Sequence, residues 1–210
     1  YKIKVENGVI DITVMLQKQH LRQNPMLNKF LDPKNDVAFK RLFGSERNKD
    51  ILIGFINDII PNKQVIDVEY LNPIQDIEAN ALKQSIVDVL CKDQDGSRYI
   101  IEMQVASHEA FIKRAQYYAA KAYSTQLKVK ETYIHLKEVI FVAITNFIMF
   151  PDKKAYKSDH VILDNQTHEH DLKDFSFTFI ELPKFERLNK QQHELTSILD
   201  KWCYFFINTP

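Results

Sequence analysis

The most regular hydrophobic pattern in the chain consists of two apolar runs on either side of Asp95-Gly96. An Asp-Gly pair between two such runs predicts a β-hairpin, and a three-residue loop would place Gly96 in the left-handed conformation that glycine adopts without steric cost. In that register Asp88 lies directly opposite Glu102, and Gln104 shares their face. The other face would carry an apolar set that belongs in a core, namely Val87, Val89, Cys91, Tyr99, Ile101, Met103 and Val105.

Beyond residue 30, helical spacing of apolar residues alternates with short, nearly continuous apolar runs. Asn35 or Asp36 would cap the first helix, and Gly44 would end it. The predicted elements are, in order, helices at 36–43 and 45–60, a strand at 65–71, the central hairpin, a helix at 108–127, a buried strand at 139–150, strands around 161–163 and 175–182, and a helix at 191–208. The main part of the chain is therefore predicted to contain both helices and strands.

The chain divides into a main domain and smaller additions. Residues 1–16 alternate around Asn7-Gly8, which suits a two-residue turn, and could form an accessory hairpin, an oligomerisation element or an expression-derived segment. Residues 17–30 are polar and indicate a linker or an exposed helix. Residues 31–190 are predicted to form the main domain, and residues 191–210 a helix that packs on it or leads out of it.

Composition narrows the class of protein. With 210 residues, 45% of them hydrophobic and 27% charged, the chain is typical of a globular protein. Lysine plus arginine equals aspartate plus glutamate at 28 each, so a DNA contact would need a local basic patch. Two cysteines indicate reduced thiols in a cytoplasmic protein rather than a disulfide framework. The longest apolar run, 139–150, is too short to cross a membrane, so no membrane contact is expected.

Two opposed carboxylates are the main chemical feature of the sequence. Like charges directly across a strand pair repel each other, so Asp88 and Glu102 need a compensating charge. A bound cation would supply it, and so would a lysine, whereas a one-residue change in the hairpin loop would move Asp88 to the other face. A second candidate for a metal is zinc bound by histidines in a predicted loop, His160, His168 and His170.

An aspartate at the end of a strand, followed by a turn and a strand with Glu-x-Gln, resembles the PD-(D/E)XK nuclease motif, with Gln104 where lysine is usual. More narrowly, the chain resembles the Rpn family of recombination-promoting nucleases, also described as PD-(D/E)XK-family transposases. The matching segments run in the family's order across about residues 30–190 and are DPKNDVAFKRLFG at 32–44, NKDILI at 48–53, Asp88, Ile101-Glu102-Met103-Gln104, Arg114, Tyr117-Tyr118 and Glu181-Leu182-Pro183-Lys184-Phe185.

The resemblance implies an α/β fold with a restriction-endonuclease-like core, in which helices flank a mixed central sheet, and the predicted order of elements matches it. It also implies that Asp88, Glu102 and the Met103 carbonyl hold Mg²⁺, for which Mn²⁺ or Ca²⁺ could substitute. Gln104 would orient the attacking water or the phosphate, because an amide neither titrates nor carries charge. Asp36 would be either a third acid near the metal or a helix cap.

The same resemblance implies a metal-dependent DNA endonuclease associated with recombination or transposition. Arg114 would grip a phosphate, and Lys40, Lys83 and Tyr117 would be further contacts to DNA. Two other functions stay open, a non-catalytic nucleic-acid- or protein-binding module on the same fold and a cytotoxic or phage-defence nuclease. DNA is the expected partner, and a homodimer is left open.

Overall fold

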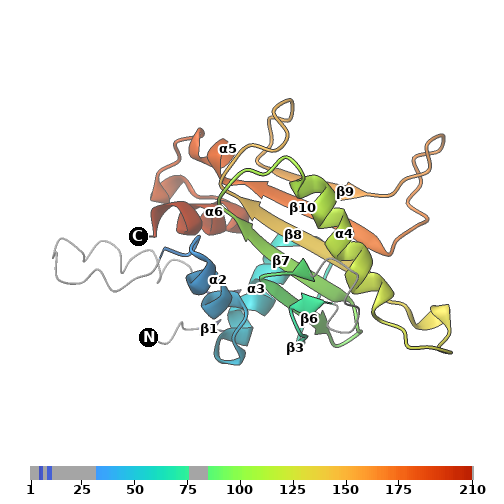
Figure 1. Ribbon diagram of the computed structural model, residues 1–210. Coiled ribbons are helices and arrows are strands. Elements are labelled where there is room, and N and C mark those ends of the chain that lie inside the picture. Colours follow the sequence, from blue (N-terminus) through green and yellow to red (C-terminus); the bar gives the residue numbers. More distant parts are fainter. Residues whose placement is uncertain (1–4, 7–8, 11–31, 76–84, 210) are drawn as a thin grey trace.

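A six-stranded mixed sheet forms the centre of the protein (Figure 1). The computed structural model describes residues 5–6, 9–10, 32–75 and 85–209. Within the sheet, β7 pairs in parallel with β8 and β8 with β10, while the other neighbours are antiparallel. The strands in spatial order are β3 (Val68–Tyr70), β6 (Val89–Asp93), β7 (Arg98–Gln104), β8 (Val139–Thr145), β10 (Phe175–Glu181) and β9 (Lys157–Val161). The sheet agrees with the predicted α/β architecture.

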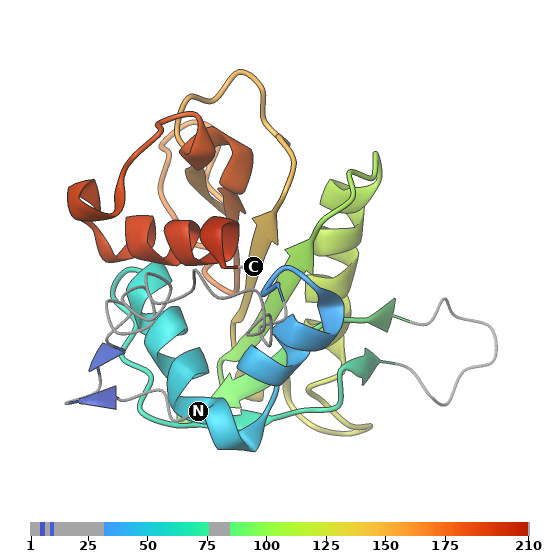
Figure 2. The same ribbon diagram turned by 90° about the vertical axis from the view of Figure 1, so that its left-hand side faces the viewer.

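Helices cover both faces of this sheet. One hydrophobic cluster joins it to α2 (Asp36–Phe43), α3 (Lys49–Ile59) and α6 (Ile198–Asn208), and a second joins it to α4 (Phe111–Ser124). Figure 2 shows α4 on one side of the strands and α3 and α6 on the other. The short elements are β4 (Ile74–Gln75), β5 (Ser85–Ile86), α5 (Leu182–Glu186) and the 3₁₀ turns Glu46–Asn48, Tyr133–His135 and Gln192–Glu194. Strands covered on both faces are expected to be apolar throughout, and all seven residues of β8 are buried.

The central hairpin has the predicted register. Val89 pairs with Ile101, and the Asp93 N–H donates to the Ser97 carbonyl, so three residues form the loop and Asp88 comes opposite Glu102. Gly96 has φ 89°, in the left-handed region that glycine favours. The apolar face was predicted correctly for Val89, Cys91, Tyr99, Ile101 and Met103, which lie in the cluster with α2 and α3.

Two residues of that predicted apolar face lie elsewhere. Val87 is buried in the cluster with α4, because the chain bends at Asp88 between β5 and β6 and the strict alternation of faces is broken there. Val105 is 51% exposed, because β7 ends at Gln104. The alternation therefore holds only inside the paired strands.

Several predicted elements are shorter than the apolar patterns. The strand expected at 139–150 ends at Thr145, the helix expected at 108–127 covers Phe111–Ser124, and the strand expected at 65–71 covers only Val68–Tyr70. The helix expected at 191–208 is a 3₁₀ turn followed by α6. His160 was predicted in a loop but lies in β9, and its ring contacts the Ser158 hydroxyl. The three histidines therefore do not share one loop.

In the N-terminal segment, the structure describes only residues 5–6 and 9–10. β1 (Val5–Glu6) pairs with β2 (Val9–Ile10), with Val5 opposite Ile10, which is the register of a hairpin with a two-residue connection. The rest of the predicted hairpin and the predicted linker at 17–30 lie outside the described residues. At the other end, Trp202 and Phe206 of α6 are buried in the cluster with α2 and α3. Among the described helices, none combines the length and the apolar character needed to cross a membrane.

Candidate functional site

Asp88 and Glu102 meet where β6 begins, and each is held by the backbone of the other's strand. The Asp88 N–H donates to Glu102 Oε1 over 3.0 Å, and the Met103 N–H donates to Asp88 Oδ2 over 2.9 Å. Glu102 is 2% exposed, and the Asp88 side chain is 14% exposed. The hairpin thus fixes two carboxylates side by side at the end of the sheet, largely removed from water.

Burial makes this pair electrostatically unfavourable. Loss of water, followed by repulsion from Asp88, raises the pKa of Glu102 to about 8. Burial also raises the pKa of Asp88, although the Met103 N–H and the charge of Lys40 act in the opposite direction. A site in which two acids resist ionisation is stabilised by positive charge, and such sites are frequently functional.

Gln104 and Arg114 form the outer part of the site. Gln104 Nε2 donates to Glu102 Oε2 over 2.8 Å, and Gln104 Oε1 accepts from Arg114 Nη2 over 2.5 Å. The Arg114 guanidinium lies 4.9 Å from the centre of the Phe111 ring and 5.9 Å from that of Tyr118. Its Nε is buried without a hydrogen-bond partner. The sequence pattern indicated each of these polar residues, but only the packing of α4 on β7 brings them into one chain of hydrogen bonds.

Lys40 lies between two acids. Its Nζ is 2.6 Å from Asp36 Oδ1, one helical turn earlier, and 3.5 Å from Asp88 Oδ1. The cap of α2 is Asn35, whose side chain accepts from the Val37 and Ala38 N–H groups, so Asp36 is not the cap. A lysine therefore compensates Asp88 in part, whereas both oxygens of Glu102 accept from neutral N–H donors.

The donor set suits a hard divalent cation. The Met103 N–H faces Asp88, and because the N–H and C=O of one residue in an extended strand point toward the same neighbour, the Met103 carbonyl faces that side too. Two carboxylates and a carbonyl oxygen are ligands that Mg²⁺ accepts while it keeps several waters. Within the described ranges, no three His, Cys, Asp or Glu side chains gather closely enough to hold a metal, so the predicted histidine zinc site has no support.

The other two predicted DNA contacts are Tyr117 and Lys83. Tyr117 is 40% exposed on α4, and the Lys121 Nζ lies 4.9 Å from the centre of its ring. Lys83 lies outside the described residues. Of the predicted site residues, the structure therefore brings together Asp36, Lys40, Asp88, Glu102, Met103, Gln104 and Arg114.

A buried ion pair near the site was not among the predicted site residues. Lys184 Nζ is 2.7 Å from Glu181 Oε1 and donates to the Phe150 carbonyl over 2.8 Å, while Glu181 Oε2 accepts from the Met149 and Phe150 N–H groups. The Glu181 side chain is 1% exposed and the Lys184 side chain is 6% exposed. The pair fixes the loop after β8, whose Asn146 N–H donates to the Gln104 carbonyl. The Glu-Leu-Pro-Lys-Phe segment was the available signal, because it places both charges three residues apart within an apolar sequence.

Comparison with known proteins agrees with the geometry. The family model described as PD-(D/E)XK nuclease family transposase matches residues 33–210 and therefore includes every described member of the site. No match was found when the chain was compared with curated proteins or with solved structures. The mixed sheet flanked by helices is consistent with the α/β nuclease fold of that family. With most of its length matched, the chain belongs to the PD-(D/E)XK nuclease family transposases.

Proposed function

We propose that this protein is a Mg²⁺-dependent DNA endonuclease that hydrolyses phosphodiester bonds at the end of β7. The observation that carries this proposal is the buried pair Asp88 and Glu102, which the hairpin register forces together and whose charges are only partly compensated. Membership of a nuclease family supports DNA as the substrate. Divalent metals are typical of this family and support Mg²⁺, with Mn²⁺ or Ca²⁺ as substitutes.

Asp88, Glu102 and the Met103 carbonyl would hold the cation. A divalent cation bound there would lower the pKa of a bound water and offset the negative charge that develops on the phosphate oxygens. The protein would hold these ligands in fixed positions, because the Asp88 and Glu102 carboxylates each accept a backbone hydrogen bond from the opposite strand. Rigid placement of ligands is the main requirement of such a site.

The remaining side chains would position the DNA. Arg114 faces Gln104 and supplies a planar cation of the kind that grips phosphate. Gln104 keeps Glu102 and Arg114 in fixed relation, so in this site it orients charged groups and does not transfer protons. Lys40 is 40% exposed and lies next to Asp88, where it could meet the phosphate beside the scissile bond. Tyr117 would contact DNA farther along α4.

Cleavage of supercoiled plasmid tests the proposal. Wild-type protein should nick or linearise the plasmid with Mg²⁺ and should be inactive in chelator. Asp88→Asn and Glu102→Gln should each lose at least about a hundredfold in rate, because each removes a ligand oxygen charge. Asp95→Asn is the matched control, since Asp95 is an exposed carboxylate in the loop of the same hairpin. Cleavage that survives both site substitutions would rule out this site.

A non-catalytic DNA- or protein-binding module is the second candidate. The contact between Lys40 and Asp88 favours it, because a lysine can take the place of a metal beside an acid. In that case wild-type protein would be inert with every divalent ion, and Asp88→Asn would leave DNA binding unchanged. Binding would then depend on Arg114 and Lys40 alone.

The biological setting belongs to the same proposal. A nuclease of this family would act in recombination or transposition, in the cytoplasm, alone or as a homodimer. A cytotoxic or phage-defence role is distinguished by expression in cells, since toxicity that Asp88→Asn relieves would indicate a nuclease under partner control. Absence of toxicity together with plasmid cleavage would favour the recombination role.

A further inference from the structure

A cavity of about 570 Å³ lies at the opposite end of β7 from the acid pair. It is formed where β7 begins, where α4 ends and where residues 126–135 follow. Arg98 and Glu102 are four residues apart on one strand, which separates the two sites by roughly 13 Å along the sheet. The body of α4 covers the strand between them, because Ala115, Ala119 and Ile100 lie in one buried cluster. The cavity is therefore separate from the candidate nuclease site.

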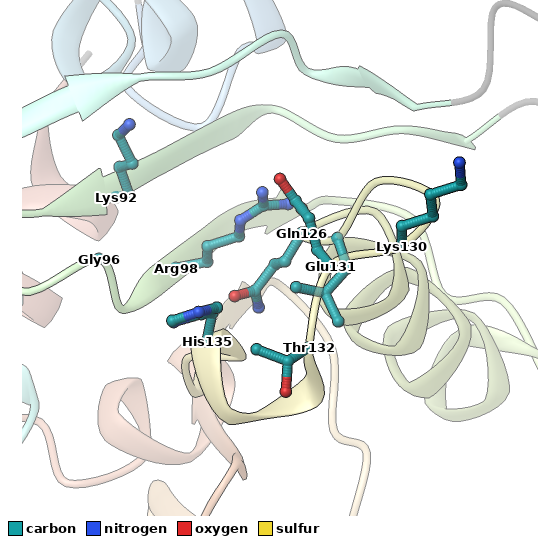
Figure 3. Close-up of a pocket in the computed structure, with 9 residues that line it drawn as sticks. Lys92, Gly96, Arg98, Gln126, Lys130, Glu131, Thr132 and His135 are labelled. Carbon is teal, nitrogen blue, oxygen red and sulfur yellow. The ribbon is translucent and has the colours of Figure 1, made fainter.

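The lining of this cavity is cationic. Lys92, Arg98 and Lys130 line it together with His135, against one carboxylate, Glu131. In the view of Figure 3 the Arg98 guanidinium lies between Lys92 and Lys130. Since the whole chain has formal net charge +0, this is a local excess of positive charge.

Arg98 is the best-placed donor for a ligand. Its Nη1 is used within the protein, where it donates to the Ala122 carbonyl over 2.7 Å and to Thr125 Oγ1 over 3.1 Å. A guanidinium carries five N–H donors in a planar fork, and among the described residues Nε and Nη2 have no hydrogen-bond partner, so they can serve a ligand while Nη1 fixes the orientation of the group. An arginine held in this way binds phosphate with little loss of side-chain freedom.

The neighbouring charges can also serve an anion. Lys92 is paired with Glu69 over 2.9 Å, but both side chains are exposed, and an exposed pair of this kind is weak enough for a phosphate to compete. The Glu131 carboxylate is drawn toward the backbone, where Oε2 accepts from the Lys128 N–H over 2.7 Å. Lys130 is exposed on the same loop.

We propose that this cavity binds a phosphorylated small molecule of about the size of a mononucleotide. Its volume falls within the range of 300–1,000 Å³ that is usual for small-molecule sites. A small ligand is favoured over a continuous DNA strand because α4 separates the cavity from the acid pair. The site is independent of the proposed nuclease activity and is tested without metal.

Titration calorimetry with adenosine 5′-monophosphate in chelator provides the test. The nucleotide should bind one per chain, inorganic phosphate should compete with it, and adenosine should bind at least about tenfold more weakly, because the charge-assisted hydrogen bonds go to the phosphate. Lys130→Glu should weaken nucleotide binding by at least about tenfold. Lys128→Glu is the matched control, because it makes the same charge change on the same exposed loop at a residue that does not line the cavity.

Four outcomes would overturn the proposal. The first is no binding at millimolar nucleotide, and the second is an equal loss in Lys128→Glu and Lys130→Glu, which would indicate only long-range attraction. The third is stronger binding of a single-stranded oligodeoxynucleotide that Lys130→Glu abolishes, which would make the cavity part of a DNA path. Nucleotide binding that persists in Asp88→Asn and Glu102→Gln supports the cavity, whereas its loss in these variants would place the nucleotide at the acid pair. None of these results depends on whether the protein cuts DNA.

Discussion

Gln104 and Arg114 are joined by a hydrogen bond of 2.5 Å between Oε1 and Nη2, while the other end of the Gln104 amide donates to Glu102. An amide presents one acceptor and two donors in a fixed plane, so a single side chain sets the positions of a carboxylate and of a guanidinium at once. A lysine at this position could donate to Glu102 but would repel Arg114. Glutamine here is therefore matched to an arginine on α4.

Substitution of both partners tests that relationship. Gln104→Ala and Arg114→Ala should each lower the plasmid cleavage rate about 10- to 100-fold, as is usual for residues that orient metal ligands or substrate. The double variant should lose much less than the product of the two, because residues in one hydrogen-bond network are coupled by about 0.5–3 kcal/mol. Lys113→Ala, which changes the neighbouring exposed cation of α4, is the control. Losses that simply multiply would show that Arg114 acts independently of Gln104.

Stability without metal should fall as the pH rises. Burial and Asp88 raise the pKa of Glu102 to about 8 from the usual 4.5, so the folded state holds a proton that the unfolded chain releases. The free energy of unfolding then decreases between about pH 4.5 and 8, by about 2–4 kcal/mol, and levels off above the folded pKa. Urea unfolding in chelator at pH 6 and pH 9 measures the part of this decrease that falls above pH 6.

Two experiments distinguish the ionisation of Glu102 from that of other residues: the substitution Glu102→Gln and the addition of Mg²⁺. The variant lacks the ionisable group and should show a smaller decrease between the two pH values. Mg²⁺ should stabilise wild-type protein more at pH 9 than at pH 6, since it binds the ionised acids. An identical decrease in wild-type and variant protein would assign the pH dependence to other residues.

Substitution of Lys40 should affect DNA binding more than metal binding. Because its Nζ is 3.5 Å from Asp88 Oδ1, Lys40 and a metal ion compete for the same carboxylate. Lys40→Ala should weaken DNA binding about 3- to 10-fold, through loss of one phosphate contact, without raising the Mg²⁺ concentration needed for half-maximal cleavage. Arg41→Ala, on the exposed side of the same helix, is the control. A higher Mg²⁺ requirement in Lys40→Ala would mean that the lysine supports the metal.

The central hairpin was predictable because it depends on neighbouring residues. The Asp-Gly pair favours a short loop, and a three-residue loop places Asp88 opposite Glu102 without knowledge of the rest of the fold. The prediction that Val87 shares a face with Val89 was wrong. The chain bends at Asp88, and a bend is not visible in an alternating pattern.

The rest of the site depends on how distant elements pack. Lys40 meets Asp88 only because Phe39 and Phe43 dock α2 on the sheet, and Arg114 meets Gln104 only because Phe111 and Ala115 dock α4 on the other face. Apolar periodicity predicted that these helices would be buried, but it does not specify which end of a helix reaches which strand. The family resemblance indicated which residues belong to the site, but it did not predict the contacts between them.

The buried pair Glu181 and Lys184 should be among the most sensitive positions of the protein. Removing one partner leaves an uncompensated charge in the interior, which costs about 3–5 kcal/mol, and Glu181→Ala also leaves the Met149 and Phe150 N–H groups unpaired. Urea unfolding should therefore give a large loss for Glu181→Ala. Glu46→Ala, which breaks a surface pair with Lys49 at the same i,i+3 spacing, should cost much less.

The double variant Glu181→Gln with Lys184→Met should recover much of the stability, because no buried charge is left and the Gln oxygen can still accept from the loop. Its cleavage rate distinguishes a positioning role from a purely structural one. The loop after β8 reaches the site through the hydrogen bond from Asn146 to the Gln104 carbonyl, so a loop held less firmly should slow cleavage even where the fold is stable. A stable double variant with wild-type cleavage would limit this pair to a structural role.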